Sequence, residues 1–260
     1  MFLSRNKPII LEDVYHIRFV MYPWDHVPLD KHLSRRNYVS EFEAMKILIK
    51  SGNTVFDVGA NIGLHSVLFR RWIGTTGKLF SFEPVPDTCD LLNETLALNK
   101  SLDVTVVHEA LSDKVGSMPI QIFPKEHSVW NSLGHPVFGD IKPQKSISIK
   151  TNTLDNFCKS NGITKIDFLK IDVEGFEKFV FLGGKDTLKN NVAKVLSFEI
   201  SQIPLAGSNT GTKEVFDTIQ SFGYSVFSFN LKTKKFEGPI THSDSFYENY
   251  YASKADLTEI

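Results

Sequence analysis

The stretch Thr54-Val55-Phe56-Asp57-Val58-Gly59-Ala60-Asn61-Ile62-Gly63 decides the fold class of this chain. Its first five residues form a short, mostly apolar run, which is typical of a strand inside a parallel sheet. A glycine-containing turn follows, and residues 62–73 are expected to form a helix. A buried strand that turns directly into a helix is the repeating unit of α/β proteins.

The same unit repeats along the chain. Further strands are expected at 78–83, 104–110, 166–172 and 192–200, and further helices at 38–50, 86–99, 154–161, 176–189 and 213–222. Residues 224–230 and 248–253 are expected to form a closing antiparallel pair. The pattern predicts an α/β, Rossmann-like fold, with a seven-stranded, mostly parallel sheet and helices on both faces.

The 260 residues suffice for one α/β domain and a short extension. Residues 1–37 are expected to be an N-terminal extension, with short strands within 8–22 and a break from Pro23 to Pro28; residues 38–260 are expected to be the main domain. Glycines and prolines between 114 and 150 argue against helices there. Edge strands at 117–123 and 146–151 are expected to flank an inserted, substrate-side loop at about 125–144.

Charge and cysteine content exclude several classes of protein. The chain has 29 lysines and arginines against 30 aspartates and glutamates, so a generic nucleic-acid binder is not expected. Two isolated cysteines, Cys89 and Cys158, argue against a zinc site or a disulfide framework. No apolar run suggests a transmembrane segment or a signal peptide, so a cytoplasmic location is expected. No sequence feature indicates an oligomeric state.

The spacing of the glycines in the first turn bears on its ligand. Dinucleotide-binding turns carry G-x-G-x-x-G and direct helix amides at a pyrophosphate. Here Gly59 and Gly63 are further apart, and Asp57 places a carboxylate near the pyrophosphate position. S-adenosylmethionine has no phosphate and carries a sulfonium and an ammonium group, so it suits this turn better. The same pattern also occurs as a purely structural connection, so the turn alone leaves both interpretations open.

Glu83 ends the next expected strand, twenty positions after Gly63, and Pro84 stops that strand. An acidic side chain at this spacing can accept hydrogen bonds from both ribose hydroxyls of a nucleotide. A solvated glutamate at a strand end is the alternative. Its distance from the first motif favours ribose binding.

A third acidic segment, Phe168-Leu169-Lys170-Ile171-Asp172-Val173-Glu174-Gly175-Phe176-Glu177, follows a buried strand. Crowded carboxylates need a cation, a proton or a metal ion to offset their repulsion. Glu174 and Glu177 are also compatible with plain helix N-terminal charges, whereas Asp172 belongs to the strand end. Mg²⁺ held by Asp172 and Glu174 is a lesser alternative, because alternate strand residues point to opposite faces. No resident metal is expected.

Together these motifs resemble the FkbM family of S-adenosylmethionine-dependent methyltransferases. The residues that carry the resemblance are 55–63, 82–84 and 170–177, with 153–155 and 198–199 as further landmarks, and the likeness covers about residues 38–200. It implies a class I methyltransferase fold. It also implies methylation of a hydroxyl on a small-molecule or glycan acceptor, either a sugar or a related natural product.

The resemblance also implies residue roles. The cofactor S-adenosylmethionine would be bound by a set that surrounds its methionine, ribose and adenine parts: Asp57, Gly59, Asn61, Gly63, Glu83, Ser112 and Asp113. A sugar hydroxyl needs a positioned base. Asp172 is the first candidate, with Glu174 and Glu199 behind it.

The central loop contains the acceptor-binding candidates. Trp130, Asn131 and Ser132 combine an aromatic face with hydrogen-bonding groups, and His127 lies just before them. This combination is typical of sugar contacts. An Asn-Ser turn anchored by a buried tryptophan is an equally good interpretation.

The sequence argues against three rival functions. An NAD-dependent sugar oxidoreductase shares the fold, but the wide glycine spacing argues against it. A nucleic-acid methyltransferase would be expected to carry an Asn/Asp-Pro-Pro-aromatic tetrad, which is absent. A non-catalytic S-adenosylmethionine-binding module is disfavoured by the intact set of Asp57, Glu83 and Asp172. The sequence thus predicts an O-methyltransferase.

Overall fold

The structure is a computed structural model that describes residues 9–13, 15–21 and 38–260. The expected break from Pro23 to Pro28 lies outside these residues. The main sheet has eight strands in the order β12-β11-β13-β10-β9-β3-β4-β5. Their bounds are β3 Thr54–Val58, β4 Lys78–Phe82, β5 Thr105–Val107, β9 Ile166–Ile171, β10 Ala193–Ser201, β11 Ser225–Asn230, β12 Lys235–Ile240 and β13 Tyr247–Ser253. Strands β10, β9, β3, β4 and β5 run parallel, as expected for the apolar strands.

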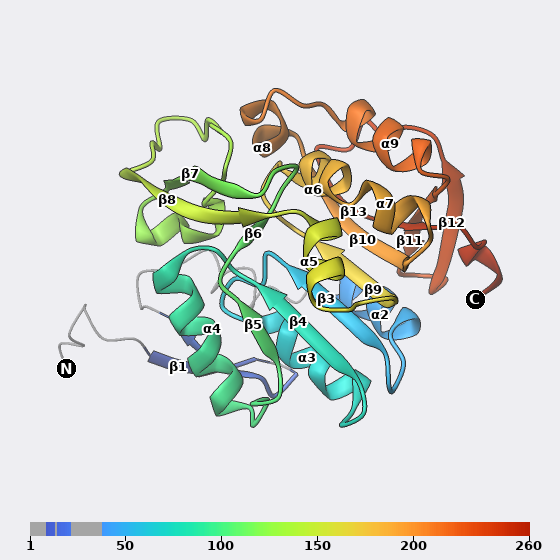
Figure 1. The fold of residues 1–260 in the computed structure, drawn as a ribbon, viewed down its shortest axis with the longest axis horizontal. Coiled ribbons are helices and arrows are strands. Elements are labelled where there is room, and N and C mark those ends of the chain that lie inside the picture. Colours follow the sequence, from blue (N-terminus) through green and yellow to red (C-terminus); the bar gives the residue numbers. More distant parts are fainter. Residues whose placement is uncertain (1–8, 14, 22–37) are drawn as a thin grey trace.

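Helices cover both faces of this sheet (Figure 1). Their bounds are α2 Tyr38–Leu48, α3 Leu64–Ile73, α4 Pro86–Leu98, α5 Leu154–Ser160, α6 Glu177–Gly183, α7 Lys185–Lys189, α8 Gln202–Gly207 and α9 Thr212–Ser221. Because successive strand residues point to opposite faces, Val55 packs with α2 and α3, whereas Phe56 packs with α5. No helix in the described ranges is long and apolar enough to cross a bilayer.

The fold class is the expected one, but several elements differ from the expected ones. The sheet gains an eighth strand because β12 pairs antiparallel with β11 beyond the expected closing pair. The expected helix at 176–189 is divided into α6 and α7. It breaks at Gly183 and Gly184, where a Cβ would lie 2.0 Å from the Ser112 carbonyl oxygen and 2.7 Å from the Leu154 side chain, respectively. Helix α8 was not expected.

The expected edge strands of the central segment do not join the main sheet. They are β7 (Gly116–Ile122) and β8 (Lys145–Asn152), which pair antiparallel in a separate three-stranded sheet with β6 (Ala110–Leu111). Figure 1 shows this sheet at the upper left, above α4. Its own small core, around Ile120 and Ile149, explains why it is separate. The loop between β7 and β8 also contains a 3₁₀ helix, Lys125–Trp130, where no helix was expected.

Two short N-terminal strands, β1 (Ile9–Glu12) and β2 (Arg18–Met21), form an antiparallel hairpin that packs on α4. The Val20 amide donates to the Thr95 hydroxyl at 3.2 Å, and Phe19 and Met21 pack around Ile62. This hairpin is therefore held against the helix that follows β4.

Candidate functional site

The turn after β3 is built on Gly59. Its backbone lies in the left-handed region, with φ +80°, and a Cβ there would lie 1.8 Å from the Asp172 carbonyl oxygen. The amides of Gly59 and Ala60 both donate to the Phe82 carbonyl, at 3.1 and 2.9 Å. Glycine thus lets the ends of β3, β4 and β9 converge at one point.

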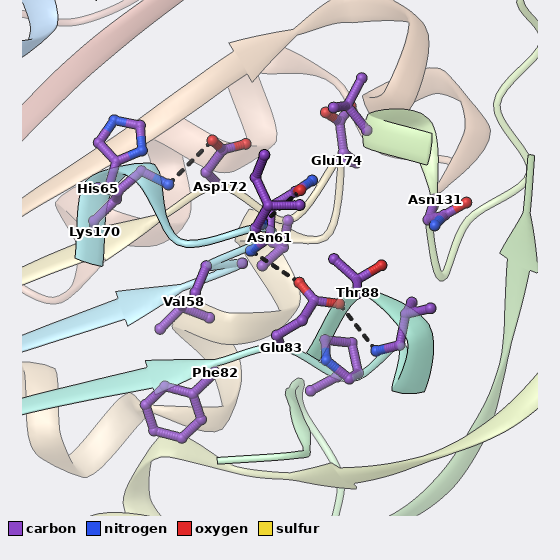
Figure 2. A pocket seen from close by; sticks show the side chains of 18 of the residues that line it. Val58, Asn61, His65, Phe82, Glu83, Thr88, Asn131, Lys170, Asp172 and Glu174 are labelled. Atoms are coloured by element: carbon purple, nitrogen blue, oxygen red, sulfur yellow. Dashed lines mark hydrogen bonds and ion pairs between the residues drawn. The ribbon is translucent and has the colours of Figure 1, made fainter. Parts of the chain in front are cut away.

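A cavity opens at this convergence, at the carboxyl ends of the parallel strands, where ligands bind in open α/β sheets. In Figure 2, Lys170, Asp172 and Glu174 lie on one side of Asn61, and Glu83 and Thr88 lie on the other. The side chains and backbone that line it include Glu41, Gly59, Ala60, Asn61, His65, Glu83, Thr88, Glu109, Ala110, Leu111, Ile120, Asn131, Leu133, Lys170, Asp172, Glu174, Glu199 and Tyr247.

Glu83 follows β4 and lies at the cavity wall. Its two carboxylate oxygens accept hydrogen bonds from the Asn61 amide at 3.0 Å and the Val85 amide at 2.9 Å (Figure 2). Burial raises its pKa to about 7, although the two amide bonds favour the charged form; the nearby Asp57 adds to the rise. The two amides therefore hold the Glu83 carboxyl group in one orientation at the cavity wall.

Asp57 has a different position from the expected one. It is fully buried and is not among the lining residues. The Ser66 hydroxyl donates to it at 2.6 Å, and Lys170 Nζ lies 3.6 Å from its other oxygen. Inside β3 its side chain points away from the turn, because the strand has not yet ended at this residue. Asp57 therefore acts on the cavity indirectly, through the ammonium group of Lys170.

Lys170 is a site residue that the sequence analysis missed. It is 2% exposed, and its Nζ lies 3.1 Å from the Asp172 carboxylate (Figure 2). Burial alone would lower the pKa of Lys170, but the charges of Asp172, Asp57 and Glu41 raise it above its ordinary value. A lysine between the apolar residues Leu169 and Ile171, two residues before an aspartate, was the available signal. Its ammonium orients Asp172.

The three catalytic candidates lie together. Oxygen atoms of Asp172, Glu174 and Glu199 are all within 4.8 Å of one another. Strand β9 ends at Ile171, so the pleat does not separate Asp172 from Glu174. Glu174 adopts a left-handed backbone, φ 51°, which an L-residue rarely takes. The cluster can bind hydroxyl donors or a cation.

Two further lining residues come from distant segments. Glu41 lies in the first turn of α2, and its carboxylate is 3.0 Å from the imidazole Nε2 of His65. Tyr247 begins β13, and its hydroxyl is hydrogen-bonded to Glu199. Burial raises the pKa of the Tyr247 hydroxyl above its ordinary value, and the negative charges of Glu199 and Asp172 raise it further. No motif connected these residues to the site.

Besides Asp57, three more of the expected cofactor residues, Gly63, Ser112 and Asp113, do not line the cavity. Ser112 and Asp113 hydrogen-bond each other just after β6, which leaves the main sheet; Glu109, Ala110 and Leu111 line the cavity instead. A Cβ on Gly63 would lie 2.6 Å from the Leu92 side chain of α4. Gly63 therefore permits contact between α3 and α4 rather than contact with a ligand.

The central loop brings one of its four acceptor-binding candidates to the cavity wall. His127 stacks on Trp130, with ring centroids 4.2 Å apart, and Trp130 stacks on Phe138; neither His127 nor Trp130 lines the cavity. Asn131 does line it (Figure 2). The Ser132 hydroxyl donates to the Glu174 carbonyl at 2.7 Å and so ties the loop to the acidic cluster.

Glu177 gives a testable pH dependence. It is 2% exposed, it accepts hydrogen bonds from the Val173 and Gly175 amides, and burial raises its pKa from 4.5 to about 7. Between these values the folded chain keeps a proton that the unfolded chain releases, so the free energy of unfolding falls as pH rises from about 4.5 to about 7. Glu177→Gln removes this contribution.

We expect the free energy of unfolding of Glu177→Gln, relative to that of the wild type, to rise by up to about 3 kcal/mol between pH 5 and pH 8. Urea unfolding at both pH values measures this difference. Glu94→Gln, a change at an exposed residue of α4, is the control and should show no such trend. An equal difference at both pH values would contradict the assignment.

Comparison with known proteins identifies one family. The Methyltransferase FkbM domain family matches residues 57–226. The methyltransferase sdnD of Sordaria araneosa is 28% identical over 160 residues, which cover 52% of this chain and 61% of that protein. The 2-O-methyltransferase NoeI of Sinorhizobium fredii is 27% identical over 193 residues, covering 69% and 76%.

A third relative and a solved structure complete the comparison. The hexuronic acid methyltransferase AglP of Haloferax volcanii is 27% identical over 168 residues, covering 60% of this chain and 61% of that protein. A Clostridium thermocellum structure, described as a candidate rRNA methylase, aligns with a TM-score of 0.51 at 9% identity, covering 85% of this chain and 98% of that one. It supports the fold alone. The match spans 61% of the length of sdnD and of AglP.

Proposed function

The chain belongs to the FkbM methyltransferase family, whose methyl donor is S-adenosylmethionine, and we propose that it methylates a hydroxyl of a sugar, a glycan or a related natural product. The observation that carries the proposal is the cavity in which Glu83 and the cluster of Asp172, Glu174 and Glu199 face the same space. The names of NoeI, a 2-O-methyltransferase, and AglP, a hexuronic acid methyltransferase, support a sugar acceptor.

The described residues fit S-adenosylmethionine. Gly59 lets the turn at the cavity wall pack against Asp172, and the carboxylate of Glu83 is held by two amides in a position suited to ribose hydroxyls. Ala110, Leu111 and Ile120 supply an apolar wall for a flat ring, in place of the expected Ser112 and Asp113. The bound cofactor would supply an activated methyl group.

Asp172 is the proposed base. Its carboxylate lies at the cavity wall and would take the proton from the acceptor hydroxyl. Lys170 holds one of its oxygens at 3.1 Å, which fixes the carboxylate in one orientation. Glu174 and Glu199 are placed to accept hydrogen bonds from the neighbouring hydroxyls of a polyol.

Cofactor binding tests the first part of the proposal. Isothermal titration should show binding of S-adenosylhomocysteine and none of NAD⁺; the reverse result would contradict it. Glu83→Gln should weaken S-adenosylhomocysteine at least about tenfold, because one charged acceptor is lost. Glu94→Gln, a change at an exposed residue, should leave the affinity unchanged.

Methyl transfer tests the second part. Glycosides and nucleotide sugars would be screened with a radiolabelled methyl donor. We expect transfer to a hydroxyl of at least one glycoside. Binding of S-adenosylhomocysteine without transfer to any acceptor would favour the alternative of a non-catalytic binding module.

A further inference from the structure

Two cavity residues lie outside the part of the chain that matches the family. The family match covers residues 57–226, whereas Glu41 comes from α2 and Tyr247 from the start of β13. Both line the cavity. Segments outside the common methyltransferase region therefore contribute to the wall beside the acidic cluster, and these residues can distinguish this chain's acceptor.

Tyr247 connects this wall to the cluster. Its hydroxyl is hydrogen-bonded to Glu199 and interacts electrostatically with the carboxylates of Asp172 and Glu41. Its residue surface is 44% exposed, so the tyrosine extends from solvent to the buried Glu199, which is 7% exposed. The hydroxyl proton directed at Glu199 fixes the orientation of that carboxylate.

The charges at this end of the cavity are unbalanced. Among the described lining residues, Glu41, Asp172, Glu174 and Glu199 face one lysine, Lys170, and one imidazole, that of His65. Lys170 is already shared between Asp172 and the buried Asp57. Bound S-adenosylmethionine would add one net positive charge, which leaves an excess of carboxylates.

We propose that Tyr247 and Glu199 form an acceptor-orienting pair and that this end of the cavity selects an uncharged polyhydroxy acceptor over one that carries a carboxylate. The proposal rests on the O-methyltransferase function proposed above. Carboxylates accept hydrogen bonds from sugar hydroxyls, and each such bond is favourable only when the partner is a donor. A carboxylate on the acceptor would be repelled by the cluster, and the one lysine among the described lining residues already pairs with Asp172 and Asp57.

A matched pair of acceptors tests the selection. Methyl glucopyranoside and methyl glucopyranosiduronic acid differ only in a hydroxymethyl or a carboxylate group. With radiolabelled methyl donor, kcat/KM should be at least about tenfold higher for the neutral glycoside, a discrimination within reach of one unfavourable charge contact. Equal rates, a preference for the uronate, or transfer to neither would overturn the proposal.

Variants assign the selection to the pair. Tyr247→Phe keeps the ring and removes the hydroxyl, so KM for the neutral glycoside should rise about tenfold while kcat changes less than threefold. Glu199→Gln should lower the ratio of kcat/KM for the neutral glycoside to kcat/KM for the uronate. Tyr250→Phe is the matched control: this hydroxyl lies on the same strand and bonds the Glu248 carboxylate at 2.7 Å, but Tyr250 does not line the cavity. It should leave KM unchanged.

Titration of S-adenosylhomocysteine into each variant separates the two proposals. Unchanged affinity in Tyr247→Phe, with a raised acceptor KM, supports the pair. Wild-type acceptor kinetics in both variants would overturn the pair and leave the methyltransferase function intact. If the wild-type chain did not bind S-adenosylhomocysteine, the proposed function itself would be contradicted.

Discussion

Gly59→Ala is expected to lower the free energy of unfolding by at least about 4 kcal/mol, a large part of the 5–15 kcal/mol typical of a domain. The added Cβ would lie 1.8 Å from the Asp172 carbonyl oxygen and 2.9 Å from its carbon. These are backbone atoms, and the Asp172 amide is itself bonded to the Val58 carbonyl at 3.0 Å. The strand ends must therefore separate. Urea unfolding measures the loss.

Two other glycines separate the steric overlap from backbone strain. Gly139 and Gly162 also have positive φ, +58° and +63°, but nothing lies within 4 Å of a Cβ at either position. Alanine at these sites should cost only the left-handed penalty of about 1–2 kcal/mol. If Gly59→Ala were as mild as these controls, the close approach of β3 to Asp172 would be wrong.

Asp172→Asn is expected to reduce the rate of methyl transfer by about 10² to 10⁴, with S-adenosylhomocysteine affinity changed less than threefold. Asparagine has nearly the same shape but cannot take up the proton of the acceptor hydroxyl. Lys170 keeps an anionic neighbour in Asp57, 3.6 Å away, so it is not left as an isolated buried charge. Single-turnover transfer from a radiolabelled donor measures the rate directly.

Asp167→Asn is the matched control on the same strand. Asp167 lies near the other end of β9, where it accepts the Thr54 amide at 2.9 Å and pairs with Lys165. Its replacement should affect stability and leave the rate unchanged. If Asp172→Asn transferred the methyl group at the wild-type rate, the base would have to be sought at Glu174 or Glu199.

The sequence determined the features that depend on neighbouring residues. Apolar runs of strand length predicted the five parallel strands, and the Gly59 turn followed from the glycine after β3. Glu83 was singled out because it ends the next strand twenty positions after Gly63, and it lies beside the turn because the parallel strands β3 and β4 end at the same edge. Asp172 followed for the same reason. These relations are fixed by strand direction and pleat alone.

The tertiary structure decided which of these side chains face the cavity. Asp57 is one residue too early in β3 and points into the interior beside Lys170, whereas Asp172 lies just past the end of β9. Ser112 lies outside the cavity because β6, which precedes it, belongs to a second sheet with β7 and β8. The alternation of residues in β7 and β8 predicted strands but not this pairing. Strand periodicity fixes the face of a sheet but not the partner strand.

The proposed acceptor side of the site depends almost entirely on long-range packing. Glu41 and Tyr247 are more than 200 positions apart in the chain, yet both line the cavity beside Asp172. Trp130 was expected there and instead stacks between His127 and Phe138. Local sequence patterns encode the cofactor half because it is formed by strand ends, whereas the other half is formed by segments that meet only when the whole sheet has assembled.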